Sequence, residues 1–172
     1  MPNHDKLAAA AHLVVARSAP GVIGATKLNK ILWFADCEYY RRHGRSLTGE
    51  TAYRRLEFGP CPNGIGSVLD RLKRDNAIAE TPHQIAHLTQ RTFVAIADPD
   101  LRTLTGEEVD ILLTVAQEIS VMTAKEASEL SHDDLWQATE PNGLMSVEAG
   151  SVRVLAPTPE VIEWAKAAFA AE

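Results

Sequence analysis

Cysteine is scarce in this 172-residue chain, which contains only Cys37 and Cys61. Two cysteines cannot build the disulfide framework of a small secreted domain, and neither stands in a C-x-x-C or paired Cys/His spacing that would indicate zinc. A chain of this length buries roughly 70% of the surface of its unfolded form, so its core needs no disulfide or metal. We therefore expect one domain over residues 1–172, with no cofactor, in the reducing environment of the cytoplasm.

Long apolar runs are also missing. Near the N-terminus the longest run covers residues 7–16, and His12 interrupts it, whereas a membrane-spanning helix needs ~20 apolar residues. The adjacent Asp5 and Lys6 differ from the basic start of a signal peptide. The sequence therefore predicts no membrane segment and no export signal.

The glycine and cysteine patterns of common active sites are incomplete. Gly59 and Gly64 have the spacing of a phosphate-binding P-loop, but Ile65 and Gly66 follow where a lysine and a hydroxyl residue are required. The Rossmann pattern lacks its third glycine. Cys61 stands close to a predicted helix start, which lowers a thiol pKa, yet no histidine is identifiable as its base. The favoured interpretation of this segment is a sharp corner.

The segment SHDDLW, residues 131–136, combines a histidine with two carboxylates. Because His132, Asp133 and Asp134 are consecutive, their side chains point in different directions on a helix and cannot converge on one ion. Capping of a helix by Ser131 is the favoured interpretation. We therefore predict that the protein is not an enzyme and has no catalytic, cofactor-binding or metal-binding residue.

Positive charge is rare in the second part of the chain. Residues 75–172 contain 5 Lys/Arg against 17 Asp/Glu, residues 1–74 contain 12 against 6, and the net charge of the whole chain is -6. Such asymmetry is a hint of a charged partner, because the summed field of a protein steers association. The alternative is that both parts pack together and their surface charges serve solubility.

Helical periodicity dominates both ends of the sequence. It predicts helices over residues 6–17, from Thr26 to about Arg42, and from Pro62 for about three turns. Short strands are expected at residues 51–58, 77–81, 84–88 and 92–97. Later helices are expected at capping patterns: Thr105 with Glu108, Thr123 with Glu126, Ser131 with Asp134, and Thr158 with Pro159. The predicted fold is mainly α (α+β): a single helical domain with a small β-sheet or hairpin inserted between N-terminal and C-terminal helices.

Two basic residues mark one edge of the second helix. Lys27 and Lys30 are three residues apart and lie beside the apolar stripe that contains Leu28, Ile31 and Leu32. We expect both lysines to be exposed, where they would meet phosphates, an acidic protein face or only solvent.

Three segments in order resemble the SocA-like antitoxins built on the Panacea domain: TKLNKILWFAD (residues 26–36), LEFGPCP (56–62) and SHDDLW (131–136). The residues on motif positions are Lys27, Leu28, Lys30, Leu32, Phe58, Gly59, Pro60, Pro62, His132 and Trp136. Two positions depart from the family pattern. Leu135 replaces the proline that usually precedes the tryptophan, and Ser131 replaces a threonine.

The resemblance implies a mostly helical domain that acts by binding. It would neutralise a co-encoded toxin by direct contact, and some members of the family are thought to deliver the toxin to a cellular protease. The resemblance carries over no catalytic residue and leaves the oligomeric state open. Together with the charge pattern it predicts a partner-binding surface made by Lys27, Lys30, Phe34, Arg54, Arg55, Phe58, Gly59 and Pro60.

Two other functions compete with the antitoxin hypothesis. The first is a nucleic-acid-binding transcriptional regulator whose basic N-terminal half contacts phosphates, although the acidic balance of the chain counts against it. The second is a hydrolase that uses Cys61 or His132, and it is the least favoured. The antitoxin hypothesis predicts that Lys30→Glu weakens partner binding while the fold survives, provided that the lysine is exposed.

Overall fold

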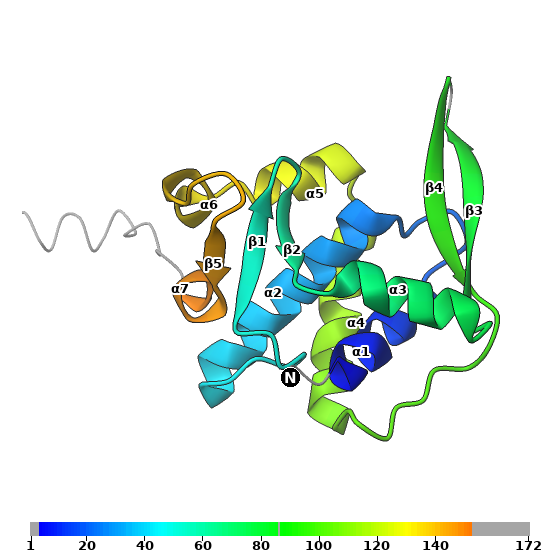
Figure 1. The fold of residues 1–172 in the computed structure, drawn as a ribbon, viewed down its shortest axis with the longest axis horizontal. Coiled ribbons are helices and arrows are strands. Elements are labelled where there is room, and N and C mark those ends of the chain that lie inside the picture. Colours follow the sequence, from blue (N-terminus) through cyan, green and yellow to red (C-terminus); the bar gives the residue numbers. More distant parts are fainter. Residues whose placement is uncertain (1–3, 86, 153–172) are drawn as a thin grey trace, which may run out of the picture.

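The computed structural model describes residues 4–85 and 87–152 and has a mixed α+β fold (Figure 1). Its elements in chain order are α1 (Asp5–Ala16), α2 (Ala25–His43), β1 (Ala52–Leu56), β2 (Gly59–Pro62), α3 (Ile65–Arg74), β3 (Ile78–Ile85), β4 (Leu88–Ala95), α4 (Gly106–Ser120), α5 (Ala124–Leu130), α6 (Asp134–Ala138), β5 (Leu144–Ser146) and α7 (Val147–Ser151). The combination of helices with an inserted β-hairpin agrees with the expected α+β class.

Helix α2 lies at the centre of the molecule and contacts α4, α5, α7 and β2 (Figure 1). It can do so because apolar side chains occupy more than one of its faces, including the fully buried Leu28, Ile31 and Trp33. The helix starts one residue before the expected Thr26. It ends at His43, and the following Gly44, with a φ of 66°, has the left-handed conformation that commonly closes a helix.

A buried carboxylate connects α2 to the first strand. Asp36 is 0% exposed and accepts hydrogen bonds from the backbone N and the hydroxyl of Thr48 (2.7 and 2.6 Å) and from the hydroxyl of Tyr53 (2.7 Å). Burial raises the pKa of Asp36 to about 6, against the effect of these hydrogen bonds. The network fixes the position of β1 on α2.

Two antiparallel sheets are present in the described residues. One has the strand order β2-β1-β5, with Tyr53 opposite Pro62 on one side and Met145 on the other, and the second is the β3-β4 hairpin. Figure 1 shows β3 and β4 extending away from the helices.

The strands expected at residues 51–58, 77–81 and 92–97 correspond to β1, β3 and β4, but other predictions in this part of the chain were wrong. The helix expected from Pro62 begins at Ile65, because residues 59–62 pair with β1 as strand β2. The strand expected at residues 84–88 is instead divided between the end of β3 and the start of β4. Strand β5 was missed because three residues cannot reveal an alternating pattern.

Two of the four expected capping patterns are confirmed. Thr105 with Glu108 and Thr123 with Glu126 form reciprocal caps at the starts of α4 and α5. The prediction for Ser131 was wrong, because Asp133 caps α6 by accepting a hydrogen bond from the backbone N of Trp136 at 2.9 Å. The helix expected at Thr158 and Pro159 lies outside the described residues. Across residues 4–85 and 87–152, no helix combines the length and apolar character needed to span a membrane.

Candidate functional site

The turn between β1 and β2 brings the three motif segments together. Gly59 has a φ of 105°, and a Cβ atom there would collide with Ser131 Oγ and lie 2.6 Å from Lys30 Nζ. Only glycine combines this backbone angle with so close an approach. The corner at Gly59 therefore lies directly against α2 and the end of α5.

Lys30 is buried beneath this turn. It is 1% exposed, and its Nζ donates a long hydrogen bond of 3.5 Å to the carbonyl oxygen of Pro60. Burial lowers its pKa to about 8, against the opposing effect of the neighbouring Cys61 thiol. The expectation that Lys30 is exposed was wrong, because strand β2 covers this edge of the helix. Lys30→Glu would therefore introduce a buried carboxylate and test stability rather than docking.

Lys27 is also buried, at 8% exposed, so the same expectation was wrong for it. Its Nζ donates to the carbonyl oxygen of Ser120 at 3.2 Å, the last residue of α4. A cation is favourable at the C-terminal end of a helix, where carbonyl groups lack partners. Burial lowers the pKa of Lys27, and the carboxylate of Glu126 opposes that shift. This lysine joins α2 to α4.

Trp136 fixes α6 against the β1–β2 hairpin. Its indole Nε1 donates to the carbonyl oxygen of Leu56 at 3.1 Å. The His132 ring stacks on it at 3.8 Å between centroids, and the Arg55 guanidinium lies 3.8 Å from the centroid of the same indole. Two groups this close to one ring cannot share a face, so Trp136 lies between His132 and Arg55. Arg55 also donates to the carbonyl oxygen of Trp136 at 2.8 Å.

Helix α5 completes the arrangement. Ser128 Oγ donates to the carbonyl oxygen of Phe58 at 2.9 Å, and Ser131 Oγ donates to the carbonyl oxygen of Ser128 at 2.7 Å. We call the whole set the motif cluster: Lys30, Arg55, Gly59, Pro60, Ser128, Ser131, His132 and Trp136. Burial, with a further contribution from Lys30, lowers the pKa of His132, so its ring is neutral at pH 7.

Cys61 has the environment of a packed thiol. It lies on β2 rather than at a helix start, and Asn29 donates to its Sγ at 3.4 Å. Burial raises the pKa of this thiol despite the nearby Lys30, so the reactive thiolate is disfavoured at neutral pH. Within the part of the chain that the structure describes, no cluster of three or more His, Cys, Asp or Glu residues could hold a metal ion.

The structure divides the predicted partner-binding residues into three groups. Lys30, Arg55, Gly59 and Pro60 converge in the motif cluster. Phe58 and Arg54 are exposed beside it, with Phe58 61% exposed at the tip of the turn. Lys27 and Phe34 lie apart from the turn.

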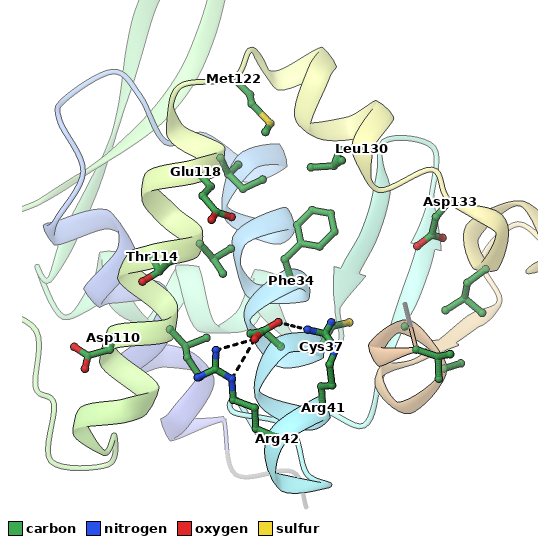
Figure 2. Close-up of a pocket in the computed structure, with 18 of the residues that line it drawn as sticks. Phe34, Cys37, Arg41, Arg42, Asp110, Thr114, Glu118, Met122, Leu130 and Asp133 are labelled. Carbon is green, nitrogen blue, oxygen red and sulfur yellow. Dashed lines mark hydrogen bonds and ion pairs between the residues drawn. The ribbon is translucent and has the colours of Figure 1, made fainter. Parts of the chain in front are cut away.

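Phe34 lies in a groove of about 1070 Å³ between α4 on one side and the α5–α7 region on the other (Figure 2). The sequence analysis missed this groove. Helical periodicity indicated only that α4 packs on a core, and it could not show that Ile111, Val115 and Ile119 also line a groove.

Three basic residues near the end of α2 have partners within the protein. Arg41 and Arg42 both pair with Glu38, Arg42 at 2.8 Å, and Arg45 donates to the Tyr39 hydroxyl at 3.1 Å. With Lys27 and Lys30 buried, these residues do not supply the free cations that a phosphate-binding face needs.

A comparison with known protein families supports the resemblance seen in the motif residues. The family model described as "Antitoxin SocA-like, Panacea domain" matches residues 28–137, which begin inside α2, include the β1–β2 turn and end just after Trp136. No curated protein shows a significant match, and no solved structure does. Since the family model covers well over half of the 172 residues, the chain belongs to the family of SocA-like antitoxins with a Panacea domain.

Proposed function

We propose that this protein is an antitoxin that neutralises a co-encoded toxin by direct protein contact, without catalysis and in the cytoplasm. Membership of the SocA-like antitoxin family is the observation that carries the proposal. The polar groups of the motif cluster are already paired within the chain, so they are better suited to hold a binding surface in shape than to carry out chemistry.

The motif cluster supports this role because its hydrogen bonds are made within the protein. Ser128 and Trp136 hold the carbonyl groups of Phe58 and Leu56, so the tip of the hairpin cannot move freely. A preorganised turn loses little entropy when it binds. In this proposal Lys30, Arg55, Gly59 and Pro60 position the turn rather than contact the toxin.

Phe58 and Arg54 are the proposed contact residues. Phe58 is 61% exposed, and the exposed Arg54 donates a 3.0 Å hydrogen bond to the carbonyl oxygen of Asn142. Aromatic residues and arginine are enriched in protein interfaces. The turn therefore presents side chains of the types that dominate protein binding energy.

Growth rescue tests the proposal directly. The open reading frame next to this gene is expressed alone and together with the antitoxin, and we expect growth arrest in the first culture and growth in the second. Equal growth of the two cultures contradicts the proposal.

The contact residues need a matched comparison in the same assay. We expect Phe58→Ser to reduce rescue and co-purification of the toxin. Ile96→Ser is the control, because Ile96 is 59% exposed at the end of the distant β4. If both variants behave alike, Phe58 is not a contact residue.

Delivery of the toxin to a protease is a finer form of the same proposal. The half-life of the toxin with and without the antitoxin separates the two possibilities. A shorter half-life indicates delivery, and an unchanged one indicates that binding alone blocks the toxin.

A further inference from the structure

The groove beside Phe34 has an apolar floor that reaches solvent. Helix α2 forms the base, α4 one wall, and the α5–α7 region the other wall (Figure 2). Leu130 and Val152 line it while 51% and 68% exposed, and Phe34 and Met122 are half-buried. Exposed apolar side chains that share one hollow are a feature of interaction sites.

Helix α4 presents two parallel rows of side chains to this groove. Ile111, Val115 and Ile119 form the inner row, and Asp110, Thr114 and Glu118 form the outer row. Both rows follow the spacing of three or four residues that aligns side chains along a helix. Figure 2 shows Asp110, Thr114 and Glu118 following one another along α4. From Glu107 to Glu118 the wall is about 16 Å long, the length of a three-turn helix.

The rim of the groove carries uncompensated negative charge. Asp110 and Glu118 on α4, and Asp134 on the opposite wall, are exposed and form no ion pair with the described residues. Asp133, next to Asp134, is also exposed without an ion pair there, but one of its carboxylate oxygens caps α6. The two basic residues of the lining, Arg41 and Arg42, already pair with Glu38. The surplus is therefore acidic on both walls.

We propose that this groove receives a basic amphipathic helix of the toxin, with lysines or arginines at intervals of three or four residues beside an apolar face. The apolar floor would hold that face, and the two acidic walls would pair with the basic residues, as in helix-in-groove recognition. The inference rests on the proposed function and adds the chemistry of the partner segment.

Charge also disfavours the other occupants. A second copy of this chain carries a net charge of -6. Residues 153–172, which follow Val152 at the edge of the groove, contain two basic and three acidic residues. Neither a second copy nor residues 153–172 carries the net positive charge that would complement the acidic rim.

A charge-reversal experiment tests the inference with the purified product of the neighbouring open reading frame as the probe. Asp110→Lys/Glu118→Lys is compared with Asp75→Lys/Asp98→Lys, in which two exposed carboxylates outside the groove receive the same change. Calorimetric titration at low salt should show binding weakened about tenfold or more by the groove variant and by less than about twofold by the control. Thermal unfolding of both variants checks that the fold is intact.

The outcomes separate the inference from the proposed function. If the wild type binds and both double variants behave alike, the groove proposal is overturned while the antitoxin proposal stands. If the wild type neither binds nor rescues growth, the antitoxin proposal fails and the groove proposal fails with it.

Two further measurements address the rival occupants. Sedimentation equilibrium compares the wild type with the groove variant Asp110→Lys/Glu118→Lys. A dimeric wild type together with a monomeric variant would assign the groove to a second copy of the chain. Efficient disulfide formation between the two introduced cysteines, in the free chain carrying Thr114→Cys and Ala165→Cys with Cys37→Ala and Cys61→Ala, assigns it to residues 153–172. Either result overturns the proposal.

Discussion

The motif cluster and the acidic groove both include residues of α5 and α6, but they use their polar groups in opposite ways. In the cluster, Ser128, Trp136 and Arg55 direct their donors to backbone carbonyl groups of the same chain. In the groove, Asp110 and Glu118 form no ion pair with the described residues. The comparison shows that the residues by which the family is recognised hold a shape, whereas groups free to contact another molecule lie beside them.

Among the variants that test this comparison, Gly59→Ala is expected to have the largest effect on the free energy of unfolding. The variant combines an unfavourable φ with a collision against Lys30 and Ser131, so the free energy of unfolding should fall by about 3 kcal/mol or more. Gly44→Ala is the matched control, because Gly44 also has a positive φ but a Cβ added there would meet nothing within 4 Å, and about 1 kcal/mol is expected. Denaturant unfolding measures both, and similar losses would mean that the turn is not crowded.

Lys30→Met tests whether the buried lysine is a stabilising residue. The pKa of Lys30 is about 8 in the folded chain against 10.5 unfolded, so the folded state releases the proton first. Relative to the variant, the wild-type free energy of unfolding should therefore rise by about 3 kcal/mol as the pH increases from 8 to 10.5. The variant should lack this rise and be at least as stable as the wild type at pH 7, since methionine leaves no buried charge.

Both proteins in this comparison should carry Cys61→Ala, so that the thiol does not titrate in the same range. Denaturant unfolding at several pH values gives the two stability curves. A Lys30→Met variant that keeps the wild-type rise would show that another group causes it, and a strong loss of stability at pH 7 would show that the ammonium group is needed for folding.

A smaller effect is expected from Arg55→Lys within the cluster. Lysine cannot stack its charge on Trp136 and donate to the Trp136 carbonyl group in the same planar way, so a loss of about 1 kcal/mol is predicted. Arg54→Lys on the same strand is the control, with a loss of at most about 0.5 kcal/mol, because the exposed Arg54 lacks the stack. Equal losses in denaturant unfolding would argue against a role for the stack.

The smallest effect on stability should come from the groove. Leu130→Gln changes a side chain that is 51% exposed, so the free energy of unfolding should change by less than about 0.5 kcal/mol while toxin binding weakens. Ala127→Gln on the same helix is the contrasting change, because Ala127 is 0% exposed and a larger side chain there should cost about 2 kcal/mol. Leu130→Gln with full toxin binding would remove Leu130 from the docking surface.

Local signals were predictable where a short segment determines its own structure. The starts of α4 and α5 followed from Thr105 with Glu108 and from Thr123 with Glu126, because a capping box needs only four consecutive residues. The corner at Gly59 was also identified from its glycine and prolines. The burial of Lys27 and Lys30 was not predictable, because helical spacing places a side chain on a face of the helix but does not show what covers that face.

The amino-acid sequence was sufficient for the helical segments, the sharp turn at Gly59 and the family, because each depends on residues close together or on an ordered set of motifs. The folded structure was needed to establish that Lys30 lies under the turn, that Trp136 lies between Arg55 and His132, and that two acidic walls enclose an apolar groove. These arrangements join residues up to about a hundred positions apart, and the packing that selects them leaves no periodic trace in the chain.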